Sequence, residues 1–163
     1  MVEPSFLNVL RQIYARLSDS DVDWLVTASF GLALQALPIE THDIDLQTTQ
    51  AGAYEIERRF AEFVTKPVTF SESEYIRSHF GALTIDGIQV EIMGDFQIRL
   101  ADGTWEEPID LQTIKRFIEV DGMRIPIPSL ESENEAYAKL GRWERVAILR
   151  QWLQKEGDAA KSR

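Results

Sequence analysis

Cysteine is absent from the 163 residues, and histidine occurs only twice. Without cysteine the chain has no disulfide framework, no zinc ribbon and no cysteine nucleophile. With His42 and His79 far apart in the sequence, a zinc site is disfavoured as well. A reducing, cytoplasmic location fits this composition and is the default prediction. At 18.6 kDa the chain is long enough for one domain with its own hydrophobic core.

Long apolar runs are also lacking. No stretch approaches the roughly 20 apolar residues that cross a bilayer. The first residues, Met1 to Pro4, lack the basic and apolar segments of a signal peptide. We therefore expect neither a membrane partner nor a signal peptide.

Positive charge is scarce, because 17 Lys and Arg face 27 Asp and Glu and give a net charge of −10. An acidic surface repels phosphate backbones, so binding to long nucleic acid is disfavoured. The negative charge is unevenly distributed along the chain, since residues 139–163 hold seven basic and three acidic residues. This basic segment could bind a polyphosphate, or it could form a solvated helix face with ion pairs within the helix.

Hydrophobic spacing predicts an α+β fold in one domain, with a mixed β-sheet, flanking helices and a C-terminal helical pair. We expect a core over residues 1–128, with the helices of residues 129–163 packed on the same domain. Asp-Gly pairs at 86–87, 102–103 and 121–122 predict hairpin turns. Helices are expected at about 4–17, 30–37, 51–64, 129–141 and 142–156, with Gly157 ending the last and a frayed tail at 158–163; strands are expected at 24–27, 43–46, 80–85 and 88–93, and hairpins within 96–109 and 117–127.

The strongest chemical signal is Asp43-Ile44-Asp45. Residues i and i+2 of a strand share a face, so Ile44 would point to the core and both carboxylates away from it. Adjacent carboxylates repel unless a cation lies between them, and oxygen ligands suit Mg²⁺. A strand with two solvent-facing acids gives the same pattern, and a lone Asp-x-Asp favours that plainer interpretation.

Two further residues add context to this motif. Ser29 follows a strand at the start of a helix, where free backbone N–H groups receive phosphate, although serine also commonly caps helices. Glu91 alternates with Val90 and Ile92, so it would face away from the core. There it can join the two aspartates, or lie on the surface as an ordinary glutamate.

Together, Ser29, Asp43, Asp45 and Glu91 resemble the nucleotidyltransferase fold of the DNA polymerase β superfamily, most closely its small minimal or abortive-infection-type members. The shared pattern is a strand, a turn into a helix, Asp-x-Asp and a third acid on a later strand, here within residues 24–92. The resemblance implies that Asp43 and Asp45 bind two Mg²⁺ ions. It also implies that Glu91 binds the catalytic ion and helps to activate the acceptor hydroxyl.

The resemblance assigns the nucleoside triphosphate (NTP) to the turn residues Ala28 and Ser29, with Lys139 reaching the phosphates from a late helix. A lysine on the solvated face of an acidic helix is the equal alternative for Lys139. The chain departs from the family at Ala28, where glycine is usual, and at Ile39, where many relatives have arginine. A Cβ at a tight turn would weaken the hold on the triphosphate.

The implied function is transfer of a nucleoside monophosphate from an NTP to an acceptor hydroxyl. A protein side chain or a small molecule is favoured over a tRNA 3′ end, given the acidic charge. A partner protein is a further expectation, since small members of the superfamily often work with one. Two other classes stay open: a degenerate nucleotide-binding or toxin–antitoxin module, and a structural oligomerisation domain.

Overall fold

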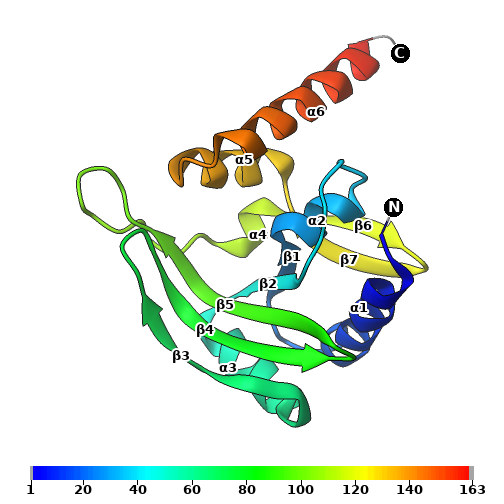
Figure 1. The fold of residues 1–163 in the computed structure, drawn as a ribbon, viewed down its shortest axis with the longest axis vertical. Coiled ribbons are helices and arrows are strands. Elements are labelled where there is room, and N and C mark those ends of the chain that lie inside the picture. The colour runs from blue at the N-terminus through cyan, green and yellow to red at the C-terminus, as the bar shows by residue number, and fades with distance from the viewer. Residues whose placement is uncertain (1, 162–163) are drawn as a thin grey trace.

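The computed structural model describes residues 2–161, and Figure 1 shows their arrangement. A mixed sheet with flanking helices confirms the predicted α+β fold. The helices are α1 (Pro4–Leu17), α2 (Ala28–Leu34), α3 (Gln50–Arg59), the 3₁₀ turn η1 (Ala61–Phe63), α4 (Leu111–Ile114), α5 (Leu130–Lys139) and α6 (Trp143–Lys161). The strands are β1 (Trp24–Thr27), β2 (Ile44–Thr48), β3 (Val64–Glu72), β4 (Ile76–Ile85), β5 (Ile88–Ile98), β6 (Lys115–Val120) and β7 (Met123–Pro128).

The main sheet has five strands in the order β1-β2-β5-β4-β3. Strands β2 and β5 run parallel, and every other neighbouring pair is antiparallel. Strands β6 and β7 form a separate two-stranded ribbon, and β7 packs against β1. Strand β2, which Asp43 precedes and which carries Asp45, is therefore the neighbour of β5, which carries Glu91.

One face of the sheet is buried under α1 and α3 (Figure 1). Ile44 and Leu46 of β2 point to this face, as do Val90 and Ile92 of β5, and all four are fully buried. The predicted alternation along both strands is therefore confirmed. Residues 45 and 91, which alternate with these core residues, are directed to the opposite face.

Helices α4 and α5 contact the opposite side of β1, and α6 packs on α5. A second apolar cluster joins α5 and α6 to α2: Leu32, Leu37, Leu130, Tyr137, Val146 and Leu149. Figure 1 shows α6 continuing beyond α5 to the C-terminal end. Within residues 2–161, no helix combines the length and the apolarity needed to span a bilayer.

Two of the three predicted Asp-Gly turns are confirmed. Asp86 and Gly87 have φ values of 49° and 79°, and Asp121 and Gly122 have 48° and 78°. Positive φ at both positions is what a type I′ hairpin turn requires. The third pair lies in a chain reversal, closed by an antiparallel bridge between Arg99 and Trp105 and a hydrogen bond from the N–H of Gly103 to the carbonyl of Leu100. Only Gly103 of this pair has a positive φ, so it does not form the predicted two-residue turn.

The helix predicted over 51–64 is too long, since α3 ends at Arg59. The nine-residue strand β3 that follows was not predicted. Only Val68 of β3 is buried, so the strand lacks the apolar alternation that identifies a half-buried strand. Its proline, Pro67, is tolerated because β3 lies at the edge of the sheet.

The predicted end of the last helix is also wrong. Helix α6 passes through Gly157 and reaches Lys161. A Cβ on Gly157 would meet no atom within 4 Å, so the glycine marks an open helix surface rather than a helix end. The expected frayed tail is therefore helical as far as residue 161, and residues 162 and 163 lie outside the described part of the chain.

Candidate active site

Strand register places three polar side chains in a row across the sheet. Thr27 of β1 lies opposite Asp45 of β2, and Asp45 lies opposite Glu91 of β5. A carboxylate oxygen from each of Asp43, Asp45 and Glu91 lies within 4.8 Å of the other two. The structure thus brings together the three acids that the sequence singled out, and their role as metal ligands stays a prediction.

The environment of Asp45 opposes a negative charge. The residue is only 9% exposed. Burial, the charge of Asp43 and a hydrogen bond with Glu91 together raise the pKa of Asp45 to about 8. A divalent cation would replace this proton and neutralise the cluster. Three convergent carboxylates are hard oxygen donors, so the donor set fits Mg²⁺.

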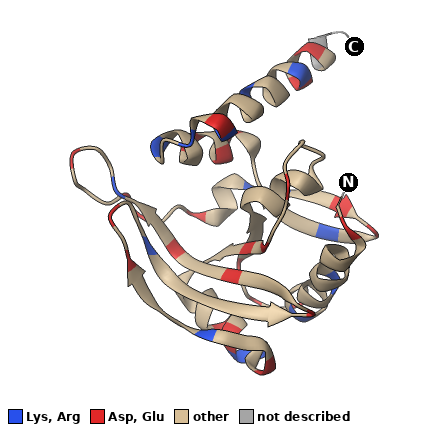
Figure 2. Cartoon of the chain, in the orientation of Figure 1, with Lys and Arg blue, Asp and Glu red and all other residues tan. Residues whose placement is uncertain are grey.

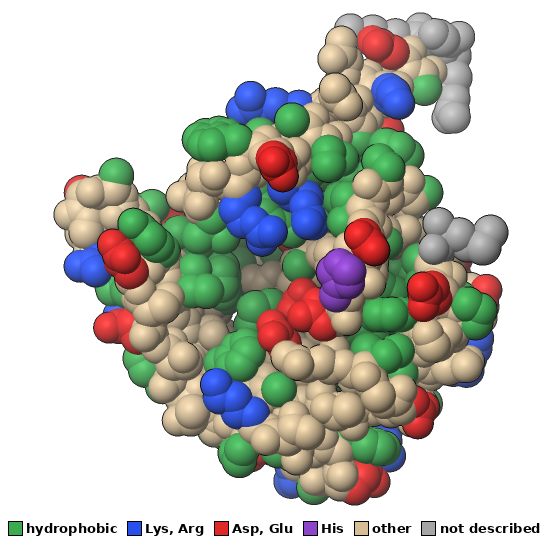
Figure 3. All heavy atoms as spheres, in the orientation of Figure 1, with side chains coloured by type: hydrophobic (Ala, Val, Ile, Leu, Met, Phe, Trp, Pro, Cys, Tyr) green, Lys and Arg blue, Asp and Glu red, His purple; other side chains and the backbone are tan. Residues whose placement is uncertain are grey.

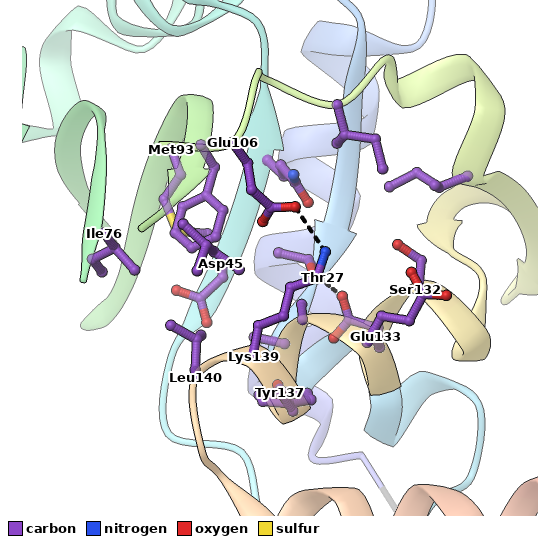
Figure 4. A pocket seen from close by; sticks show the side chains of 18 of the residues that line it. Thr27, Asp45, Ile76, Met93, Glu106, Ser132, Glu133, Tyr137, Lys139 and Leu140 are labelled. Carbon is purple, nitrogen blue, oxygen red and sulfur yellow. Dashed lines mark hydrogen bonds and ion pairs between the residues drawn. The ribbon is translucent and has the colours of Figure 1, made fainter. Parts of the chain in front are cut away.

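A pocket of about 350 Å³ opens over these acids. The space-filling view shows it as a hollow, with acidic side chains below it and basic side chains above it (Figure 3). Asp45 and Glu91 contribute to its lining, and Met93 and Ile76 lie further along the sheet (Figure 4). Its size lies at the lower end of the range for small-molecule sites.

The turn from β1 into α2 borders the same pocket. Ala28 lines the pocket and has a φ of 57°, the left-handed conformation that glycine adopts most easily. Helix α2 packs very closely on β1, since a Cβ on Gly31 would lie 2.5 Å from the carbonyl oxygen of Val26. Ser29 is the second residue of α2, is half-buried, and is not among the described residues that line the pocket.

Glu133 is a site residue that the sequence analysis missed. Its Oε1 accepts a hydrogen bond of 2.6 Å from the hydroxyl of Thr27, and its carboxylate also accepts one from the backbone N–H of Ala28. Burial nevertheless raises the pKa of Glu133. The available signal was its position on α5 between Leu130 and Tyr137, which places it on the buried face of that helix.

Lys139 lies at the end of α5 on the pocket wall, and its contact with the phosphates stays a prediction. Its Nζ lies 2.7 Å from Oε2 of Glu106, a residue of the loop between β5 and α4 (Figure 4). Arg142 also lines the pocket, with its guanidinium 5.2 Å from the ring centre of Tyr137. Figure 2 shows basic residues along α5 and α6 above the acids of the sheet.

Solved structures resemble the whole chain. A provisionally assigned nucleotidyltransferase from Thermotoga maritima is 59% identical, covering 95% of this chain and 96% of its own, with a TM-score of 0.84. The lincomycin-bound lincosamide antibiotic adenylyltransferase LnuA is 11% identical over 91% of this chain and 97% of its own, with a TM-score of 0.59. ANT(2'')-Ia in complex with adenylyl-2''-tobramycin is 13% identical over 94% of this chain and 92% of its own, with a TM-score of 0.60.

At these low identities the two antibiotic adenylyltransferases show a shared fold and nothing more. A comparison with curated proteins gives no significant match. The sequence pattern of the aminoglycoside-2''-adenylyltransferases matches residues 9–148, most of the chain. The nucleotidyltransferase resemblance is thereby confirmed, while the narrower abortive-infection type stays a prediction. The chain belongs to the aminoglycoside-2''-adenylyltransferase family.

Proposed function

We propose that the chain transfers a nucleoside monophosphate from an NTP to a hydroxyl group of a small molecule. The observation that carries the proposal is the cluster of Asp43, Asp45 and Glu91, whose carboxylates converge within 4.8 Å beside a pocket of small-molecule size. Membership of an adenylyltransferase family supports this reaction class.

The three carboxylates are proposed to hold two Mg²⁺ ions. When bound, these ions would supply charge neutralisation for the phosphates and a lowered pKa for the attacking hydroxyl. Asp43 and Asp45 would be ligands of both ions, and Glu91 would be a ligand of the ion that activates the acceptor hydroxyl. Asp45 holds a proton in the metal-free protein, and this proton would dissociate when Mg²⁺ binds to the three carboxylates.

The chemical step is an in-line displacement at the α-phosphorus of the NTP. The acceptor oxygen forms a bond to this phosphorus while the bond to the bridging oxygen of the leaving group breaks, so pyrophosphate departs. The hydroxyl proton would pass to the carboxylate of Glu91, which lies on β5 opposite Asp45. The chain's own contribution is therefore to position the reactants and to accept one proton.

The turn at Ala28 and Ser29, together with Lys139, is proposed to hold the triphosphate. Ala28 and Lys139 line the same pocket as Asp45, which supports the assignment. Ser29 would act through its position in the first turn of α2. Because Lys139 is paired with Glu106, it must exchange this carboxylate for a phosphate when the nucleotide binds.

The acceptor is proposed to be a small molecule because the pocket is small and closed by α5 on one side. Two neighbours of the same fold were solved with antibiotic ligands, which agrees with this choice. A protein side chain and a tRNA 3′ end are the alternative acceptors. Action together with a partner protein, and a toxin–antitoxin role, stay predictions.

One observation favours a second candidate, a nucleotide-binding module without catalysis. Ala28 has a left-handed backbone and places a Cβ where the resemblance predicts glycine. If this Cβ displaces the triphosphate from the carboxylates, the protein would bind nucleotide without transferring it. The same experiment separates the two candidates.

The test is NTP-dependent release of pyrophosphate in the presence of Mg²⁺ and a panel of hydroxyl compounds. Asp45→Asn and Glu91→Gln are expected to abolish turnover, whereas Glu119→Gln, an exposed acid on β6, should leave it unchanged. Loss in both site variants with an active control supports catalysis. Stabilisation of the protein by Mg²⁺ and NTP without any turnover would support the binding module instead.

A further inference from the structure

We propose that the acceptor is an amphipathic hydroxyl compound, which packs an apolar face against the end of the pocket away from the cluster of Asp43, Asp45 and Glu91. The inference rests on the proposed function for the identity of the ligand as an acceptor. The apolar subsite itself is a property of the pocket, and its occupation can be measured without catalysis.

A β-bulge in β5 builds this apolar end. Arg77 of β4 lies opposite Gln97 of β5, and His79 lies opposite Gly94, so β5 has one extra residue in this interval. The interval includes Asp95, whose φ is 51°. Its carboxylate accepts a hydrogen bond from the backbone N–H of Gln50 at 3.1 Å, which fixes the bulge against α3.

The bulge changes which side chains line the pocket. Before it, Glu91 and Met93 line the pocket; after it, Phe96 and Ile98 do so. In a regular strand, residues 96 and 98 would share a face with residues 92 and 94, which is the face under α3. The inserted residue therefore turns two large apolar side chains toward the pocket, and bulges beside active sites commonly re-aim side chains in this way.

The apolar wall continues to the mouth of the pocket. Ile76 from β4 and Ile109 from the loop after β5 both line it, and they are 38% and 46% exposed. Exposed apolar side chains grouped around a pocket are typical of a ligand that covers them. The space of about 350 Å³ suits a small molecule rather than a macromolecule.

Four of the acids that line the pocket have a partner or a proposed role within the protein. Glu106 is already paired with Lys139, and Glu133 is buried in its hydrogen bond with Thr27. Asp45 and Glu91 belong to the proposed cation cluster. Glu107 and Glu135 also line the pocket, and both are exposed. The apolar wall alone therefore argues for an amphipathic acceptor, and a polycation is the competing ligand that the test includes.

The test compares two glycosides that carry the same hydroxyl groups, methyl β-glucoside and hexyl β-glucoside. Their binding to the full chain is measured by calorimetry with Mg²⁺ and a non-hydrolysable ATP analogue. We expect the hexyl compound to bind about tenfold more tightly or better, because its alkyl chain leaves water for the apolar wall. The polycation tobramycin serves as the third probe.

Variants locate the site. Ile76→Ser and Ile109→Ser alter exposed side chains, so both should fold, and each should weaken hexyl glucoside binding about threefold to tenfold. Phe70→Ser is the matched control, because Phe70 is 51% exposed on β3 and packs against His79, which lies opposite Gly94 on the α3 face. It should leave binding unchanged.

The outcomes separate this inference from the proposed function. Preferential hexyl glucoside binding that falls in the isoleucine variants supports the apolar subsite, even if no compound is ever adenylylated. Equal binding of the two glycosides, an equal loss in Phe70→Ser, or tight binding of tobramycin alone overturns it. Turnover with tobramycin would then leave the proposed reaction standing with a different acceptor.

Discussion

Ala28 combines backbone strain with a position in the candidate site. Its φ of 57° costs alanine about 1–2 kcal/mol relative to glycine. The structure tolerates this conformation because Glu133 accepts a hydrogen bond from the Ala28 N–H and α2 packs closely on β1. Alanine in place of the glycine that the resemblance predicts is therefore a local cost and not a change of fold.

Replacing Ala28 by glycine is expected to raise the free energy of unfolding by about 1 kcal/mol, measured by urea denaturation. It should also tighten NTP binding, because the turn loses the Cβ beside the proposed phosphate site. Ala36, with a φ of 68° just after α2, is the matched control. Ala36→Gly should stabilise the protein similarly without changing NTP affinity, and a destabilised Ala28→Gly variant would contradict the account.

The buried pair of Thr27 and Glu133 gives the second prediction at this scale. Thr27→Val removes the hydroxyl donor and should cost about 1–3 kcal/mol, because the buried carboxylate loses a partner. Glu133→Gln should cost less, since its amide oxygen can accept the same bond without a buried charge.

A double-mutant cycle in urea isolates the pair. Thr27→Val should be less destabilising in the Glu133→Gln background than in the natural chain. Additive losses would show that the contact between β1 and α5 does not hold the turn in place.

At the scale of elements, local signals identified the hairpins and the strands that carry the acids. The Asp-Gly pairs at 86–87 and 121–122 specify their turns, and alternation in β2 and β5 gave the correct faces. Strand β3, the bulge at Asp95 and the burial of Glu133 depend on contacts with distant segments. Sequence patterns alone do not specify such contacts, so these features were missed.

The loop after β5 and helix α5 meet through the ion pair of Glu106 and Lys139. Glu106→Gln should free Lys139 for the triphosphate and lower the KM for NTP about twofold to fivefold, the range expected for a partly exposed pair. Steady-state kinetics provides the measurement.

Two further variants test whether the change in KM depends on Lys139. Lys139→Met should raise the KM, and Glu106→Gln should have no effect in its background. Glu72→Gln removes a comparable partner of Arg77, 3.3 Å away, and should leave the KM unchanged. An improvement that persists without Lys139 would contradict its assignment to the phosphates.

For the whole molecule, acidic residues outnumber basic ones, with 27 Asp and Glu against 17 Lys and Arg. Three of the acids behind the net charge of −10 converge in one cluster, so cation binding would make the working molecule less acidic. The division into residues 1–128 and 129–163 stays a prediction. The apolar cluster that joins α5 and α6 to α2 favours a single cooperative unit.

Stability of the metal-free protein should depend on pH through Asp45. Its pKa is about 8 in the folded chain, against 3.8 for an unperturbed aspartate, so the folded state holds more protons than the unfolded state between these values. The free energy of unfolding contributed by this group therefore falls as pH rises through that window. Thermal unfolding should show a steeper decline for the natural chain than for Asp45→Asn, and Mg²⁺ should offset it. Equal slopes would contradict the raised pKa.

The central claim is that Asp43, Asp45 and Glu91 share bound cations. A crystal structure with Mn²⁺ and a non-hydrolysable ATP analogue tests it directly, because anomalous scattering locates the metal. We predict Mn²⁺ peaks at about 2.0–2.3 Å from carboxylate oxygens of all three residues, with the triphosphate reaching the turn at Ala28. A bound nucleotide whose metal ions touch none of these carboxylates would contradict the account.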